Sequence, residues 1–185
     1  MDAQPLITLA EEAHTALSLM IASGRDHISA ISECNRRASS TLADLHARLF
    51  RVFMPPLPRE GCARLAEAQH TLMGTVFAAA LLFPAHTSSV GEHRREELRD
   101  LSRISALLYE ATATLPRFVR GKQPPPPDTF RFYAEQNKAR AAHALCVLHD
   151  ERSLFDRALN ESLGEIGRAL DWAVSALLTL MLQSV

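Results

Sequence analysis

The feature that most constrains this chain is the spacing of its apolar residues, which recur every three or four positions almost from end to end. That spacing puts apolar side chains on one face of an α-helix, whereas the alternation typical of a half-buried strand is scarce. With 47% hydrophobic residues among 185, the chain can bury a sizeable core. The sequence therefore predicts an all-α fold, a six-helix antiparallel bundle that forms one domain over residues 1–185.

Glycine, proline and capping residues mark the ends of the predicted helices. The first helix ends at Ser23-Gly24, and the run MPPLP at 54–58 separates the second from the third, with Pro58 at the first position of the third. Asp128 and Ser153 are placed to cap the fifth and sixth helices. The four prolines at 124–127 favour a stiff polyproline II spacer, and a ligand for an SH3-type domain is the alternative.

A weak internal repeat suggests that the bundle consists of two related three-helix halves, at about 1–84 and 92–185. The stretch that begins at Leu65 can be laid over the stretch that begins at Leu163. Four positions then coincide: Leu65 with Leu163, Glu67 with Glu165, Leu72 with Leu170, and Val76 with Val174. Chance similarity between two amphipathic helices remains the alternative explanation.

Charge and composition exclude several classes of protein. Lys and Arg total 20 against 21 for Asp and Glu, so no basic surplus points to nucleic acid. The N-terminus lacks the basic start of a signal peptide, and the most apolar stretch, 173–182, is too short to span a membrane. The three cysteines have no zinc-site spacing, which favours reduced thiols and a cytoplasmic protein.

Several polar residues receive structural interpretations. Asn35 interrupts the apolar seam of the second helix and is expected to be a buried amide that fixes helix register. The run from Glu92 to Asp100 is expected to be a solvated face. His143, Cys146 and His149 are spaced three apart, which spreads them around the helix, so we expect a partly buried thiol and two surface imidazoles.

The segment from Leu49 to Val76 carries a resemblance to a known family. It resembles the signature of the PhoU-like accessory proteins of Pit-type phosphate transporters, which read Leu-Phe-x-x-Phe, a proline turn, then Arg-Glu before a helix. The matching residues stand in the family's order and spacing: Leu49, Phe50, Phe53, Pro56, Arg59, Glu60 and Leu65. The resemblance implies two related three-helix bundles and a cytoplasmic regulatory partner of a phosphate transporter.

In the wider family, helical motifs with two carboxylates four residues apart bind metal ions, and this chain departs from that pattern. The motif of the second helix would fall on Asn35 and Ser39, and that of the third on His70 and Gly74. In the second half the equivalents lie near Gln136, Arg140, Gly167 and Asp171, where Arg140 places a fixed positive charge. We therefore expect no metal and no cofactor at these positions.

Three hypotheses about function follow. The first is a regulatory, non-enzymatic protein that binds a transporter or another cytoplasmic protein through a helical face, since no nucleophile, phosphate-loop or metalloprotease motif is visible. The second is a bundle that binds metal through other ligands, drawn from Glu33, Glu67, His70 and Asp171. The third is a structural homo-oligomer, and a homodimer is also compatible with the first two.

Overall fold

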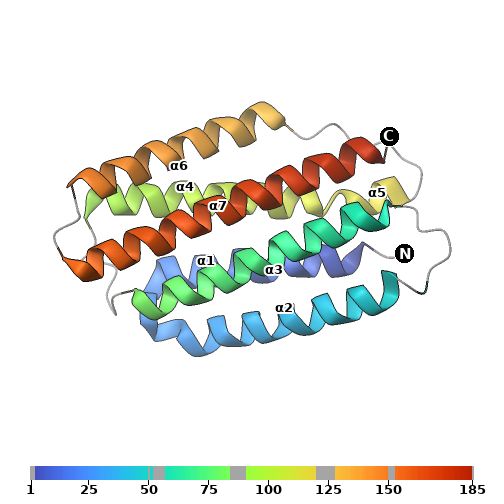
Figure 1. Ribbon diagram of the computed structural model, residues 1–185, viewed down its shortest axis with the longest axis horizontal. Helices are drawn as coiled ribbons and strands as arrows, with labels where there is room; N and C mark the ends of the chain where they lie inside the picture. The colour runs from blue at the N-terminus through green and yellow to red at the C-terminus, as the bar shows by residue number, and fades with distance from the viewer. Residues whose placement is uncertain are drawn as a thin grey trace.

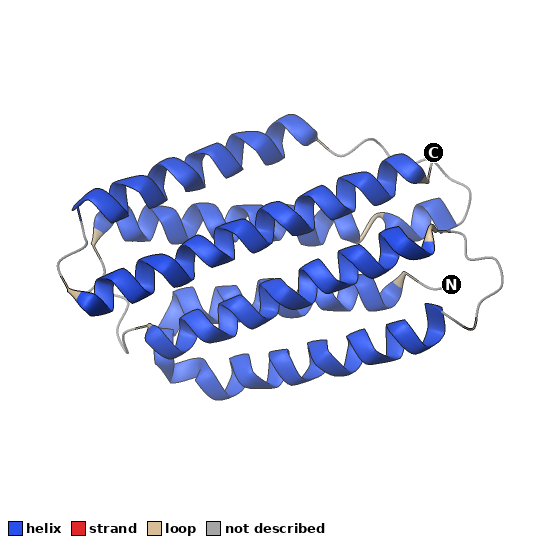
Figure 2. Ribbon diagram, viewed as in Figure 1, coloured by secondary structure: helices blue, strands red, loops and turns tan. Residues whose placement is uncertain are grey.

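The computed structural model describes residues 3–49, 51, 57–83, 91–119, 128–149 and 153–184. Helices make up nearly all of these residues, and the described ranges contain no strand (Figure 2). All six predicted long helices are present, so the all-α fold is confirmed: α1 (Gln4–Ser23), α2 (Ile28–Leu49), α3 (Arg59–Leu82), α4 (Glu92–Thr112), α6 (Thr129–His149) and α7 (Leu154–Gln183). A 3-10 turn, η1 (Gly24–His27), and a five-residue helix, α5 (Leu115–Val119), are additional.

The long helices lie roughly alongside one another in an elongated bundle (Figure 1). Helices α1, α2 and α3 pack together, as do α4, α6 and α7, and the two groups meet where α3 lies along α7 and α1 along α4. Helices α2 and α6 run along opposite edges of the bundle (Figure 1). The most extensive contact is the one between α3 and α7, across the two groups, so the two halves and their origin by duplication both stay predictions.

The four coincident positions of the proposed repeat also agree in burial. Their leucines and valines are at most 2% exposed, and both glutamates are exposed to solvent. In α3, the residues that follow the three- and four-residue apolar spacing of the sequence are all buried: Cys62, Leu65, Gln69, Leu72, Val76, Ala79 and Phe83. Gln69 is the polar member of this seam, and its Nε2 donates to Thr112 Oγ1 of α4 at 3.4 Å.

The capping predictions for the last two long helices are confirmed. Ser153 Oγ accepts a hydrogen bond from the backbone nitrogen of Asp156 at 3.1 Å, and Asp128 Oδ1 accepts one from that of Arg131 at 3.0 Å. Each bond satisfies a backbone donor that the first helical turn leaves without a partner. Pro58 lies one residue earlier than predicted, since it is the N-cap of α3 and Arg59 is the first helical residue.

The predicted seam of α2 is wrong at its polar position. The buried face of this helix follows Ile31, Cys34 and Ala38, and Asn35 is only half-buried at the edge of that face. A step of three residues from Ile31 puts Cys34 inward, and the next position is then rotated about 100° away. Asn35 is therefore not the buried amide that the sequence suggested.

The prediction of a solvated face from Glu92 to Asp100 holds for four of its charged residues, Glu92, Arg95, Glu96 and Arg99, and is wrong for three others. Arg94, Glu97 and Asp100 are 4%, 1% and 8% exposed. Their spacing of three places them along one face of α4, which is covered because α4 packs against α1, α6 and α7. Arg94 and Glu97 are tolerated inside the bundle because they pair with each other, and Asp100 pairs with Arg103.

Candidate functional site

The family-type ligand positions of the first half come together across α2 and α3, but without carboxylates. Ser39 Oγ and His70 Nε2 lie 3.0 Å apart, within hydrogen-bond distance. Ser39 also donates to the backbone oxygen of Asn35 at 3.0 Å, and a side chain at Gly74 would meet nothing within 4 Å. One imidazole and one hydroxyl converge here, which is a weak donor set for a divalent cation.

The corresponding positions of the second half meet across α6 and α7. Arg140 Nη2 donates to Asp171 Oδ2 at 2.6 Å, so the guanidinium occupies the side of the carboxylate where a cation would bind. Gln136 and Gly167 line a pocket beside this pair. The fixed positive charge that the sequence predicted at Arg140 is thus balanced by the one carboxylate of the set.

The alternative metal ligands do not gather into one site. Glu33 pairs with Arg36 at 2.6 Å, Glu67 lies 3.8 Å from His46, and Asp171 is taken up by Arg140. Within the described ranges, no group of three His, Cys, Asp or Glu side chains could hold a metal ion. The expectation that the protein binds no metal remains a prediction.

The family-signature residues that the structure describes lie at the end of α2 and in the first turns of α3. Leu49 is buried at the end of α2, and Arg59 and Glu60 form the exposed first turn of α3, where Glu60 pairs with Arg64 at 2.6 Å. The carboxylate of Glu60 suits the positive end of the helix. Phe50, Phe53 and Pro56 lie outside the described residues, as does the polyproline run at 124–127.

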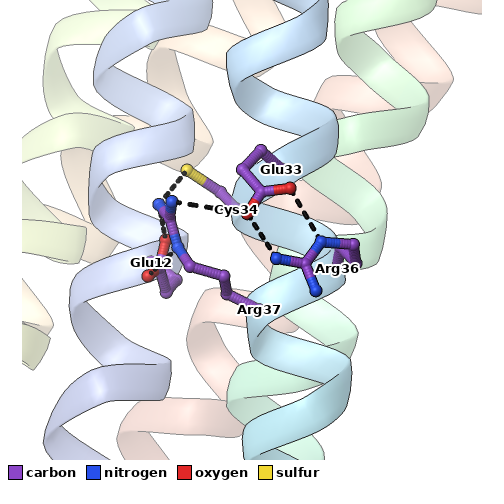
Figure 3. Close-up of polar contacts among 5 residues, drawn as sticks. All are labelled: Glu12, Glu33, Cys34, Arg36 and Arg37. Atoms are coloured by element: carbon purple, nitrogen blue, oxygen red, sulfur yellow. Dashed lines mark hydrogen bonds and ion pairs between the residues drawn. The ribbon is translucent and has the colours of Figure 1, made fainter.

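A polar cluster links α1 to α2 in the first half (Figure 3). Arg37 donates to both carboxylate oxygens of Glu12, at 2.6 and 2.7 Å, and its Nη2 reaches Cys34 Sγ at 3.5 Å. Burial, with Glu12 beside it, raises the pKa of the Cys34 thiol to about 11. A thiol with so high a pKa is a poor nucleophile, so this cluster is a connection between helices rather than a reactive site.

The most buried polar network, which contains Arg94 and Glu97, was not predicted from the sequence. Arg94 Nη1 donates to Glu97 Oε2 at 2.7 Å, and Arg94 Nη2 donates to Asn160 Oδ1. The other carboxylate oxygen of Glu97 lies 2.6 Å from His143 Nδ1. The network therefore joins α4, α6 and α7. His143, predicted as a surface imidazole, is only partly exposed, at 31%, because its Nδ1 faces this network.

Cys146 and His149 match their predictions more closely. Cys146 is fully buried, and His149 is exposed, with its ring 5.8 Å from that of His93. All three cysteines are unbridged and buried. The three-residue spacing from His143 to His149 thus spreads these side chains around α6 and does not make a metal site.

The outer face of α6 is uncharged and mostly apolar, although it lies opposite the core. We define this face as the exposed residues Phe130, Ala134, Asn137, Ala141, Ala144 and Leu148. Phe130 and Leu148 are 86% and 75% exposed. At 100° per residue, the charged residues Arg131, Lys138 and Arg140 fall on the sides of the helix instead. A surface helix normally presents its charges opposite the core, so this arrangement makes the outer face of α6 a candidate binding surface.

The four-three spacing of the outer face of α6 is that of helices that pack against another helix. The outer face of α2, at the opposite edge of the bundle, differs because it exposes Arg36 and Ser40 along with Ala43 and Ala47. Within the described residues, no helix is both long and apolar enough to cross a membrane. The outer face of α6 is therefore a mostly apolar, exposed stripe on a helix whose opposite side packs against α4 and α7.

Comparison with known proteins identifies the fold. No family model matches the chain, and no curated protein matches it. The crystal structure of a PhoU-like protein from Shewanella oneidensis MR-1 is similar over 100% of both chains, with a TM-score of 0.78 and 14% sequence identity. At this identity the similarity shows the fold alone, and it agrees with the PhoU-like bundle that the motif implied.

Proposed function

We propose that this chain is a non-enzymatic accessory protein of phosphate transport that binds its partner through the outer face of α6. The partner would be the cytoplasmic side of a phosphate transporter or another regulatory protein. The observation that carries the proposal is the uncharged outer face, on a helix whose charges lie to the sides. The phosphate context is supported by the full-length similarity to a PhoU-like protein and by the signature at Leu49–Glu60.

The outer face of α6 fits a protein partner better than a small ligand. Its exposed alanines let another helix approach closely, and Phe130 and Leu148 at its two ends supply apolar anchors. Helical grooves and faces of this kind are recognised through side chains at three- and four-residue spacing. A second copy of the chain would satisfy the same spacing, so the test has to separate the two partners.

The test compares matched glutamate substitutions on two helices. The variant Ala141→Glu with Ala144→Glu places charges on the outer face of α6, and Ala43→Glu with Ala47→Glu does so on the exposed face of α2. Exposed substitutions of this kind change stability by only about 0.5 kcal/mol. Binding to a Pit-type phosphate transporter in lipid nanodiscs is measured by biolayer interferometry, and oligomeric state by light scattering.

We expect the wild type and the α2 variant to bind the transporter and the α6 variant to lose binding. A dimer that the α6 variant alone disrupts, without any binding to the transporter, would replace the transporter by a second copy as occupant of the face. If the α6 and α2 variants behave alike in both assays, the outer face of α6 is not the binding surface.

A further inference from the structure

A pocket of about 170 Å³ lies between α4, α6 and α7. All three helices contribute to its apolar lining, which consists of Leu101, Ile104, Ala139, Leu163, Gly164 and Gly167. An apolar cavity of roughly 150 Å³ is large enough to hold benzene. The pocket between α4, α6 and α7 therefore has room for a molecule with one six-membered ring.

Two glycines of α7 keep this pocket open. A Cβ on Gly167 would extend toward Leu101, whose Cδ2 lies 3.9 Å from that position. A Cβ on Gly164 would lie 3.1 Å from His143 Nε2. Glycine weakens the interior of a helix relative to alanine, and here the two missing side chains leave space between α7 and the helices that face it.

The ionised side chains around the pocket cancel one another. Glu97 and Asp171 carry one negative charge each, and Arg140 and Arg168 carry one positive charge each. Asp171 pairs with Arg140 at 2.6 Å, and Arg168 pairs with Glu165 at 2.5 Å. Glu97 is already held inside the buried network. Neither a cation nor an anion finds an uncompensated charge here, so the lining favours an uncharged ligand.

Gln136 supplies a polar group to the pocket. Its side chain is 5% exposed, and its amide has no hydrogen-bond partner among the described residues. Side-chain polar atoms that are fully enclosed without a partner in the described ranges are Gln69 Oε1, His93 Nδ1, Glu135 Oε2 and Asn160 Nδ2. The amide of Gln136 is not one of them, so it keeps accessible surface, and that surface faces the pocket that Gln136 lines. A nearly buried amide in this state gains from a partner that both donates and accepts.

From these features we propose that the pocket between α4, α6 and α7 binds a small uncharged molecule of the class of phenol, with an apolar ring and one hydroxyl group. The ring lies against Leu101, Ile104 and Leu163. The hydroxyl bonds to the amide of Gln136, because a hydroxyl can accept from Nε2 or donate to Oε1. An apolar lining with a few polar groups that orient the ligand is typical of small-molecule sites. The inference stands independently of the proposed transporter partner.

Titration with phenol, benzene and benzoate at neutral pH tests the proposal. NMR of labelled methyl groups follows the Cδ1 signal of Ile104, which is identified by its loss in Ile104→Val. An aromatic ring beside this methyl group shifts its signal through the ring current. The Cδ1 signal of Ile31, which is buried in α2 and does not line the pocket, is the reference within the same molecule.

Two variants change the pocket and one serves as control. Gly167→Ala narrows the pocket and keeps the fold, because the new Cβ makes only an ordinary contact with Leu101. Gly74→Ala is the matched control, since it makes the same exchange inside α3, where the new Cβ meets nothing within 4 Å. Gln136→Leu keeps a side chain of similar size and removes the amide.

We expect phenol to shift the Ile104 signal saturably, with a dissociation constant below about 10 mM, and Gly167→Ala to weaken binding about tenfold, a factor equivalent to about 1.4 kcal/mol. Gly74→Ala should bind phenol as the wild type does, and benzoate should give no saturable shift. The wild type should bind phenol about fivefold more tightly than benzene, the effect of one neutral hydrogen bond. In Gln136→Leu the two compounds should bind equally.

Three results would overturn this site. The first is the absence of a saturable Ile104 shift with phenol, or an equal shift of Ile31, which would indicate general partitioning into the core. The second is equal affinity for phenol in Gly167→Ala and Gly74→Ala. The third is binding of benzoate as tight as that of phenol, or a preference for phenol that survives in Gln136→Leu. Because no transporter is present in this titration, each of these results leaves the outer face of α6 untouched.

Discussion

Removal of the Glu97 carboxylate should destabilise the bundle strongly. Arg94 and Glu97 are 4% and 1% exposed, and their 2.7 Å ion pair is the inner part of the network that joins α4, α6 and α7. In Glu97→Leu, the Arg94 guanidinium stays buried, and the amide oxygen of Asn160 is the one hydrogen-bond acceptor left to it among the residues that the structure describes. Breaking a buried pair in this way costs about 3–5 kcal/mol, a large part of the ~5–15 kcal/mol that stabilises a typical domain.

The double variant Arg94→Met with Glu97→Leu should recover most of that loss. Both charges are then absent, and apolar side chains of similar length fill the space, a replacement that is often neutral for a buried pair. Urea unfolding followed by far-UV circular dichroism measures both effects. With a slope of about 2–3 kcal/mol per molar urea, the midpoint should fall by about 1–2 M in Glu97→Leu and by much less in the double variant.

Two outcomes would refute this account of the buried pair. One is a loss of less than about 1 kcal/mol of unfolding free energy in Glu97→Leu, which is the cost of an exposed pair. The other is a double variant as unstable as Glu97→Leu, since the loss would then come from packing. Arg36→Gln, which breaks an exposed pair on α2, provides the reference for a surface effect.

Three further predictions concern helix packing, capping and thiol chemistry. Gly61→Ala should destabilise the protein by about 1–3 kcal/mol, because the new Cβ would lie 2.8 Å from Leu180 Cδ1. Gly74→Ala, whose Cβ would meet nothing within 4 Å, should stabilise it by about 0.5–1 kcal/mol. The midpoints of urea unfolding compare the two variants, and equal effects would contradict the packing of α3 on α7. Ser153→Ala should cost about 1 kcal/mol in the same assay and Ser153→Asp little, because aspartate can also accept from the Asp156 nitrogen. Burial raises the pKa of Cys62 from 9.0 to about 11. Between pH 9 and 11 the thiol therefore stays protonated in the folded state but loses its proton in the unfolded state, so the free energy of unfolding should fall as pH rises. The fall should be smaller in Cys62→Ala, and the same pH profile in both proteins would count against the burial of the thiol.

The fold was predictable because apolar spacing and caps are local signals. The seam of α3 and the caps at Asp128 and Ser153 follow from residues within one or two turns of each other. The same reasoning failed at Asn35, where a shift of one residue decides which side chain faces the core. Periodicity alone leaves that shift undetermined when a cysteine and an asparagine stand side by side.

The polar network could not be predicted, since its partners are far apart in the chain. Glu97 is 46 residues from His143, and Arg94 is 66 residues from Asn160. A run of mixed charges is usually solvated, and only the packing of α4 between other helices reveals which of its charges are buried. A spacing of three among Arg94, Glu97 and Asp100 was the one signal in the sequence.

The outer face of α6 shows a different limit. This helix has two largely uncharged stripes, one through Phe132, Gln136 and Ala139 and one through Phe130, Asn137 and Ala141. Both have helical spacing, so the sequence does not say which stripe faces the core. The structure assigns the first to the core and leaves the second exposed.

Site-specific photo-crosslinking in cells tests the central claim most directly. A photoreactive residue replaces Ala141 on the outer face of α6 in one variant and Ala43 on the exposed face of α2 in the other. We predict that position 141 crosslinks to a phosphate transporter or a regulator bound to it, and that position 43 does not. Crosslinks to such a partner from position 43 and none from position 141 would contradict the proposal that this protein acts through the outer face of α6.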